Sequence, residues 1–197
     1  MKRNPKIASS TFAAYIELTK PRITYLILVS TALGYFLGAE GIDNIWKFLM
    51  CLLGSSFVSA GSGALNHYME INSDALMDRT KGRPIPTGKV NGFDALGFGI
   101  ILSLISVILL GLAVNYFAAF LLACSISFYI FIYTIWLKRR TPHNIVIGGA
   151  AGAFPPMIGW ACATGDLTLF PLILFAIIFI WTPPHFWALS LYKDIEY

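Results

Sequence analysis

The chain has 197 residues, of which 57% are hydrophobic and only 12% are charged, with a formal net charge of +4. Soluble domains carry about 25% charged residues, so this composition excludes a soluble protein. It predicts an all-α fold, a polytopic transmembrane helical bundle. No polar stretch is long enough to form a separate core, so we expect one membrane domain over residues 1–197, with a flexible N-terminus over residues 1–12. Because there is no soluble domain to carry it, we expect no binding of nucleic acid.

Apolar runs long enough to cross a bilayer predict six spans. Lysine and arginine gather in the connections on one side of these spans, and only Lys47 falls on the other side. Because cytoplasmic loops carry the excess of these residues, we expect the N-terminus and the polar loops on the cytoplasmic side of a bacterial inner membrane. The expected spans are Ile23–Ala39, Ile45–Leu65, Ala95–Val114, Tyr116–Leu137, Ile145–Ala163 and Leu167–Leu191.

The second expected span leads directly into the most polar stretch of the chain. Asn66, Glu70 and Asp74 stand four residues apart, so on a helix they share one face. Oxygen-bearing side chains of this kind suit Mg²⁺. Acids at the C-terminal end of a helix are unfavourable, so helix capping does not explain them. We predict a catalytic metal site here, with Asp78 as either a fourth ligand or the partner of a nearby arginine.

Basic residues follow this acidic row and recur after the fourth span. Guanidinium groups bind phosphate oxygens through paired hydrogen bonds, and both clusters fall on the same predicted side of the membrane. Positive-inside anchoring is the alternative explanation for each. Together with the metal site, they predict an anionic lipid substrate such as a diphosphate. The candidate diphosphate-binding residues are Arg79, Lys81, Arg83, Lys138, Arg139, Arg140 and Lys193.

Three histidines, His67, His143 and His185, lie near the cytoplasmic ends of the expected helices. Each could bind haem iron or shuttle a proton, or could simply be a hydrogen-bonded polar residue. Aromatic residues of the last two spans could line a slot for an isoprenoid tail, although aromatics at membrane depth also face lipid.

The acidic row resembles the first motif of the UbiA superfamily of intramembrane prenyltransferases, Asn-x₃-Asp-x₃-Asp, with Glu70 in place of the usual aspartate. The resemblance is closest to the branch that farnesylates haem, and it extends along the whole chain. The segments that carry it are Leu18–Arg22, Asn66–Pro84, Tyr133–Gly149, Gly152–Trp160 and Trp181–Trp187.

This resemblance implies transfer of a farnesyl group from farnesyl diphosphate to a vinyl group of haem b, which is then a substrate, and it implies a haem A synthase as the downstream partner. Mg²⁺ would be held by Asn66, Glu70 and Asp74. A second motif would begin at Lys193 and include Glu196 and Tyr197. The superfamily fold continues with further helices, so the chain is expected to be truncated after Tyr197.

Two other classes of function stay open at this point. One is a UbiA-type enzyme that prenylates an aromatic quinone precursor, and the other is a non-catalytic haem-binding or prenyl-lipid-binding protein. A transporter is disfavoured because the ionisable residues lie near the inner helix ends rather than at mid-membrane.

Overall fold

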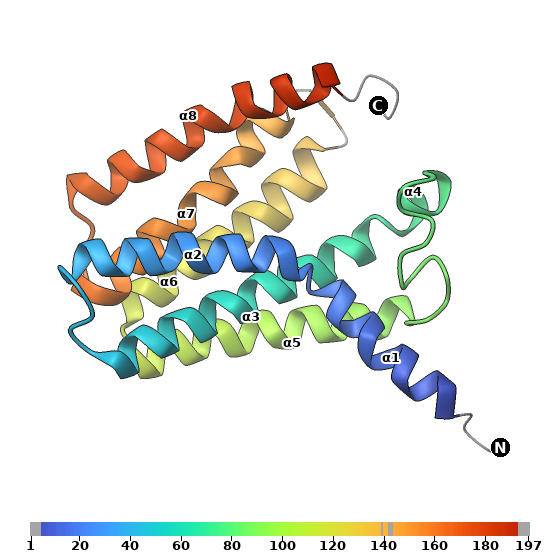
Figure 1. Ribbon diagram of the computed structural model, residues 1–197, viewed down its shortest axis with the longest axis horizontal. Helices are drawn as coiled ribbons and strands as arrows, with labels where there is room; N and C mark the ends of the chain where they lie inside the picture. Colours follow the sequence, from blue (N-terminus) through green and yellow to red (C-terminus); the bar gives the residue numbers. More distant parts are fainter. Residues whose placement is uncertain (1–4, 139, 142–143, 193–197) are drawn as a thin grey trace.

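The computed structural model describes residues 5–138, 140–141 and 144–192, and in this part of the chain every regular element is helical. The long helices lie side by side along the longest axis of the molecule, and α1 projects from one end of the bundle (Figure 1). The elements are α1 (Pro5–Leu18), α2 (Pro21–Gly38), α3 (Ile45–Met69), α4 (Ile71–Leu76), α5 (Gly92–Ala113), α6 (Tyr116–Ser127), the π-helix η1 (Phe128–Leu137), α7 (Asn144–Thr164) and α8 (Leu169–Tyr192).

Small residues bring the helices into close contact. The closest pairs are α3 with α5 and α2 with α7, and α8 packs mainly on α7. Between α3 and α5, the Ser106 hydroxyl donates a hydrogen bond to the Gly54 carbonyl oxygen at 2.7 Å. Between α2 and α7, a Cβ added at Gly159 would lie 2.0 Å from the carbonyl oxygen of Thr31. Such contacts replace the hydrophobic effect as the main cause of helix association inside a bilayer.

Five of the six predicted spans are confirmed as helices that are long and apolar enough to cross a membrane: α3, α5, α6 with η1, and most of α7 and α8. The first predicted span coincides with α2, which does not reach the same hydropathy because it begins with Pro21 and Arg22 and contains several hydroxyl side chains. Large apolar side chains face outward, including Leu112 at 76% exposure. The protein is therefore an integral membrane protein, built as a helical bundle.

The two ends of the bundle differ in their connections. At one end the turns are short, and Asn44 and Asn115 begin α3 and α6 by accepting hydrogen bonds from backbone N–H groups three residues on. At the other end lie α1, α4 and the loop between α4 and α5 (Figure 1). The predicted acidic row, and those predicted basic residues that the structure describes, lie at this second end, which is where the candidate site forms.

Candidate active site

The acidic row forms where α3 gives way to α4. Glu70 separates the two helices, but the backbone hydrogen bonds from Glu70 to Asn66 (3.1 Å) and from Asp74 to Glu70 (2.8 Å) preserve helical spacing across the break. Asn66 and Asp74 are buried, at 4% and 2% exposure. The side chains of the predicted row are thus brought together, although they belong to two helices rather than one.

The loop after α4 folds back over Asp74. One guanidinium nitrogen of Arg83 donates to both carboxylate oxygens of Asp74 at 2.7 Å. The hydroxyl of Thr80 donates to the Asp74 backbone carbonyl at 2.9 Å. Because Thr80 is buried as well, these contacts hold the loop against the acidic row.

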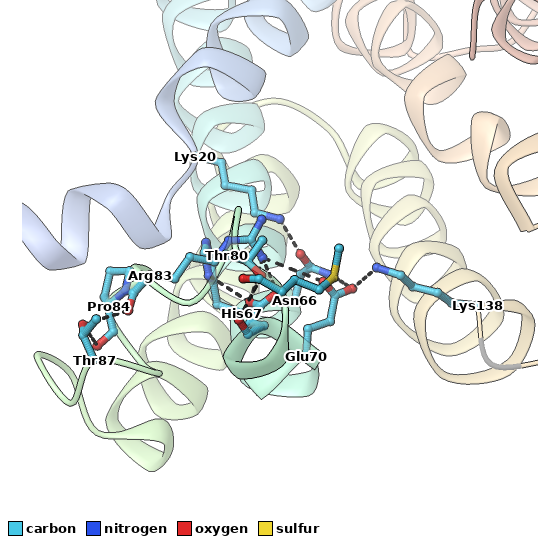
Figure 2. A network of polar contacts seen from close by, with 11 residues as sticks. Lys20, Asn66, His67, Glu70, Thr80, Arg83, Pro84, Thr87 and Lys138 are labelled. Atoms are coloured by element: carbon cyan, nitrogen blue, oxygen red, sulfur yellow. Dashed lines mark hydrogen bonds and ion pairs between the residues drawn. The ribbon is translucent and has the colours of Figure 1, made fainter. Parts of the chain in front are cut away.

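Asn66 and Glu70 receive their cations from other elements of the bundle. The Asn66 amide donates to the Glu70 carboxylate at 2.6 Å. Lys20, from the turn between α1 and α2, donates to the Asn66 side-chain oxygen, and Lys138, just after η1, donates to Glu70 (Figure 2). Arg83 also lies 4.0 Å from the second Glu70 oxygen. Residues far apart in the sequence therefore meet at one polar cluster, which we call the acid–cation cluster: Lys20, Asn66, Glu70, Asp74, Arg83 and Lys138.

Lys20 lies in the segment Leu18–Arg22 that carries the family resemblance, but the sequence does not predict it as a site residue. Its backbone adopts the left-handed conformation, with φ 50° and ψ 64°, which is uncommon for a residue other than glycine. The turn approaches α3 at Gly63, where an added Cβ would lie 2.7 Å from the Leu18 carbonyl oxygen. This close approach places the Lys20 ammonium over Asn66. The sequence signal was its position directly before Pro21 at the start of a helix.

The charges of the acid–cation cluster favour an anionic ligand. Its three cations, Lys20, Arg83 and Lys138, face two carboxylates, Glu70 and Asp74, which leaves one positive charge in excess. Burial, and the nearby charge of Arg83, lower the pKa of Lys20 to about 8, so it stays mostly protonated at pH 7. Burial alone would raise the pKa of Glu70, but the hydrogen bond and charge of Lys138 outweigh it and hold that pKa below its usual value.

The three histidine candidates differ in position. His67 is buried at 3% exposure, and its Nδ1 lies 4.0 Å from Asp74 and has no hydrogen-bond partner among the described residues. Of the two histidines that the structure describes, His67 is thus the one beside the acid–cation cluster. His185 lies on α8, where it stacks on Trp181 with ring centroids 4.3 Å apart. His143 is outside the described residues.

Several predicted ligands lie away from the acid–cation cluster. Asp78 pairs with Lys81 at 2.6 Å, with side-chain exposures of 96% and 62%, because α4 ends at Leu76 and the next residue is extended. The helical face shared by the acidic row does not continue to Asp78. Arg79 and Arg140 are exposed. The remaining candidates, Arg139, Lys193, Glu196 and Tyr197, lie outside the described residues.

The donor set of the acid–cation cluster fits a divalent cation. Within the described residues no group of three or more histidine, cysteine or acidic side chains forms a metal cage. Mg²⁺ is usually held by one or two carboxylates together with water and substrate phosphates rather than by a closed cage of protein ligands. Glu70 and Asp74 supply two carboxylates and Asn66 an amide oxygen, and the neighbouring cations suit the phosphates.

A family model described as the UbiA prenyltransferase family matches residues 27–197. Among curated proteins, the chain is 52% identical over 193 residues to the protoheme IX farnesyltransferase of Acidiphilium cryptum, covering 97% of this chain and 60% of that protein. The protoheme IX farnesyltransferase of Paracoccus denitrificans is 50% identical, with 62% of its length covered. The chain thus spans about three fifths of the length of these relatives.

Among solved structures, a UbiA homologue from Archaeoglobus fulgidus bound to GPP and Mg²⁺ superposes with a TM-score of 0.72 at 17% identity, covering 91% of this chain and 64% of that one. At this identity the likeness supports the fold alone. Together, the helical bundle, the acidic row at one end of it and the family match lead to one conclusion. The chain belongs to the UbiA prenyltransferase family.

Proposed function

We propose that this protein transfers a farnesyl group from farnesyl diphosphate to a vinyl group of haem b and so makes haem O. The observation that carries the proposal is the acid–cation cluster at one end of an apolar bundle, with its excess of positive charge. The proposed substrates follow from the relatives named protoheme IX farnesyltransferase, which are 50–52% identical along nearly the whole chain.

Each residue of the acid–cation cluster has a role in this reaction. Arg83, Lys20 and Lys138 bind the oxygens of the diphosphate and stabilise the charge that develops as it leaves. Asn66, Glu70 and Asp74 hold Mg²⁺, which when bound neutralises further charge on the leaving group. In the structure, these cations contact the same side chains that would hold the metal. When the metal and the diphosphate bind, each cation therefore has to move only a short way, from its present partner to the diphosphate.

The chemistry then requires an apolar cavity. The bond between the farnesyl carbon and the diphosphate oxygen breaks and leaves an allylic cation. The haem vinyl group attacks this cation, and water adds to the new cation beside the porphyrin ring with loss of a proton, which completes the hydroxyethyl group. His67, buried beside Asp74, is our candidate among the described histidines for a contact with haem. The second-motif residues Lys193, Glu196 and Tyr197 stay predictions, as do the remaining basic residues.

We further propose that the acid–cation cluster faces the cytoplasm across a bacterial inner membrane. The loops at that end carry the excess of lysine and arginine, which are retained on the cytoplasmic side. A haem A synthase downstream would take the product, because haem O is a lipid-soluble intermediate that stays in the membrane.

The test is haem O formation in membranes that contain the protein, with haem b, farnesyl diphosphate and Mg²⁺ supplied. Asp74→Asn should lower the rate by at least a hundredfold, since it removes a buried carboxylate of the acid–cation cluster. Asp166→Asn, at an exposed residue on the opposite end of the bundle, is the matched control and should retain the wild-type rate. Product is quantified by liquid chromatography with mass detection.

Three outcomes would overturn the proposal. Unchanged haem O formation in Asp74→Asn would remove the role of the acid–cation cluster. Prenylation of 4-hydroxybenzoate in place of haem b, with a matched prenyl diphosphate, would assign the protein to the quinone-directed class. Diphosphate binding without release of any product would instead indicate a non-catalytic carrier.

A further inference from the structure

An open apolar groove of about 700 Å³ lies between α1 and the first turns of α5, and it is separate from the acid–cation cluster. The side chains of Tyr15 and Phe98 meet across it, with ring centroids 5.1 Å apart. At its rim, Phe12 and Phe93 are exposed by 71% and 74%. Aromatic residues of this kind are typical of the membrane–water interface.

The groove runs from the interface into the membrane. α5 is one of the spanning helices, and it begins at Gly92 at the same end of the bundle as α1 and α4 (Figure 1). Asp94 lies in its first turn, whereas Ile101 lies seven residues further, about 10 Å deeper along the helix. One end of the groove is therefore at headgroup depth, and the other is at acyl-chain depth.

The charge at the shallow end of the groove is negative. Asp94 is the one charged residue among those that line the groove, and its carboxylate has no hydrogen bond or ion pair with a described side chain. Lys81 and Lys89 are exposed on the loop before α5, so an anionic lipid is drawn to that loop rather than to the groove. The groove suits a headgroup that carries a positive charge and can donate hydrogen bonds.

Gly97 leaves the floor of the groove hollow. A Cβ added at Gly97 would meet no atom within 4 Å, although the residue lies between aromatic and aliphatic neighbours on the same helix. A hollow with this lining fits a flexible hydrocarbon chain.

We propose that this groove binds one acyl chain of a phospholipid with a primary-ammonium headgroup, such as phosphatidylethanolamine, whose ammonium pairs with Asp94. The proposal does not rest on the catalytic function, because no residue of the acid–cation cluster lines the groove. An exposed charge pair of this kind is worth up to about 1 kcal/mol, which corresponds to about a fivefold preference over an anionic lipid.

The test uses the full chain in nanodiscs made of phosphatidylethanolamine and phosphatidylglycerol. In each sample, a small fraction of one of these two lipids carries a photoreactive diazirine on one acyl chain. Labelled peptides are mapped by mass spectrometry. We expect the ethanolamine lipid to label residues 12–19 and 93–101 about five times more than the glycerol lipid does, and to show no preference near Leu112 on the far end of α5. Asp94→Asn should abolish the preference.

A second variant keeps the test independent of the charge. Gly97→Leu should fill the groove and remove its labelling by both lipids without disturbing the fold, because the new side chain enters open space. Leu112→Trp, which adds bulk at an exposed position of the same helix, should leave the labelling unchanged. Equal labelling by the two lipids in the wild type, labelling that persists in Gly97→Leu, or a second copy of the chain cross-linked at the groove would each overturn the proposal.

Discussion

The pairing of Arg83 with Asp74 should contribute more to stability than any exposed ion pair at the same end of the bundle. Asp74 is 2% exposed and accepts two hydrogen bonds from Arg83, whose side chain is 25% exposed. Removing one partner of a fully buried pair costs about 3–5 kcal/mol. Because Arg83 is partly solvated, we expect Arg83→Gln to lower the free energy of unfolding by about 2–3 kcal/mol. In a chain of this size, that corresponds to a Tm lower by about 4–12 °C.

The matched comparison is Lys81→Gln on the same loop. Lys81 and Asp78 form an ion pair at 2.6 Å, but both side chains are mostly exposed, so its loss should cost at most about 1 kcal/mol. Thermal unfolding in detergent, followed by size-exclusion chromatography of the heated samples, gives the difference in Tm between the two variants.

A double-mutant cycle with Asp74→Asn isolates the pair itself. When the carboxylate is neutral, Arg83→Gln no longer leaves a buried charge unpaired, so its cost should fall by about 1–2 kcal/mol. The reasoning is refuted if Arg83→Gln and Lys81→Gln lower Tm equally, or if the effects of Arg83→Gln and Asp74→Asn are additive.

Two further predictions concern the frame of the bundle. Gly159→Ala would place a Cβ 2.0 Å from a backbone oxygen of α2, so it should destabilise the protein by about 1–3 kcal/mol in the same thermal assay. Gly152→Ala is the control, because its new Cβ would have no atom within 4 Å and should cost no stability. Equal losses in the two variants would contradict this prediction. The Tyr35 hydroxyl donates to Asp43 at 2.7 Å and lowers the pKa of that carboxyl. The stability that this hydrogen bond contributes is therefore present above the unfolded pKa of Asp43 and is lost as the pH falls through the folded pKa. Tyr35→Phe should therefore lose less stability on acidification than the wild type does. An acid limb of the stability–pH curve that is unchanged in Tyr35→Phe would refute this prediction.

The spans and the acidic row could be predicted from the sequence because each rests on a local pattern. Uninterrupted apolar runs mark the spans whatever their neighbours are, and the spacing of Asn66, Glu70 and Asp74 is the helical repeat itself. The same reasoning extended the row to Asp78 and was wrong about its helical register, since the sequence carries no strong stop signal after Leu76 and the structure ends α4 there. The loop then turns Arg83, rather than Asp78, towards the row.

Lys138 and Lys20 depend on contacts that local patterns do not contain. The sequence placed Lys138 at the same end of the spans as the acidic row, but which acid it meets is set by how η1 ends beside α3. Lys20 reaches Asn66 only because its backbone is left-handed and the turn lies against a glycine of α3. For a site assembled from separate helices, the sequence thus predicts which types of residue take part, but not which of them pair with one another.

Gly63 should therefore affect ligand binding although it offers no side chain to a ligand. A Cβ there would lie 2.7 Å from the Leu18 carbonyl oxygen, so Gly63→Ala must displace the turn that carries Lys20. We expect the affinity for inorganic diphosphate in the presence of Mg²⁺, measured by calorimetry, to fall about three- to tenfold. Lys20→Gln should lower it by at least as much, because it removes a charge-assisted hydrogen bond altogether. Gly152→Ala is the control at an open position. If Gly63→Ala binds diphosphate as the wild type does while Lys20→Gln does not, the close approach at Gly63 does not position Lys20.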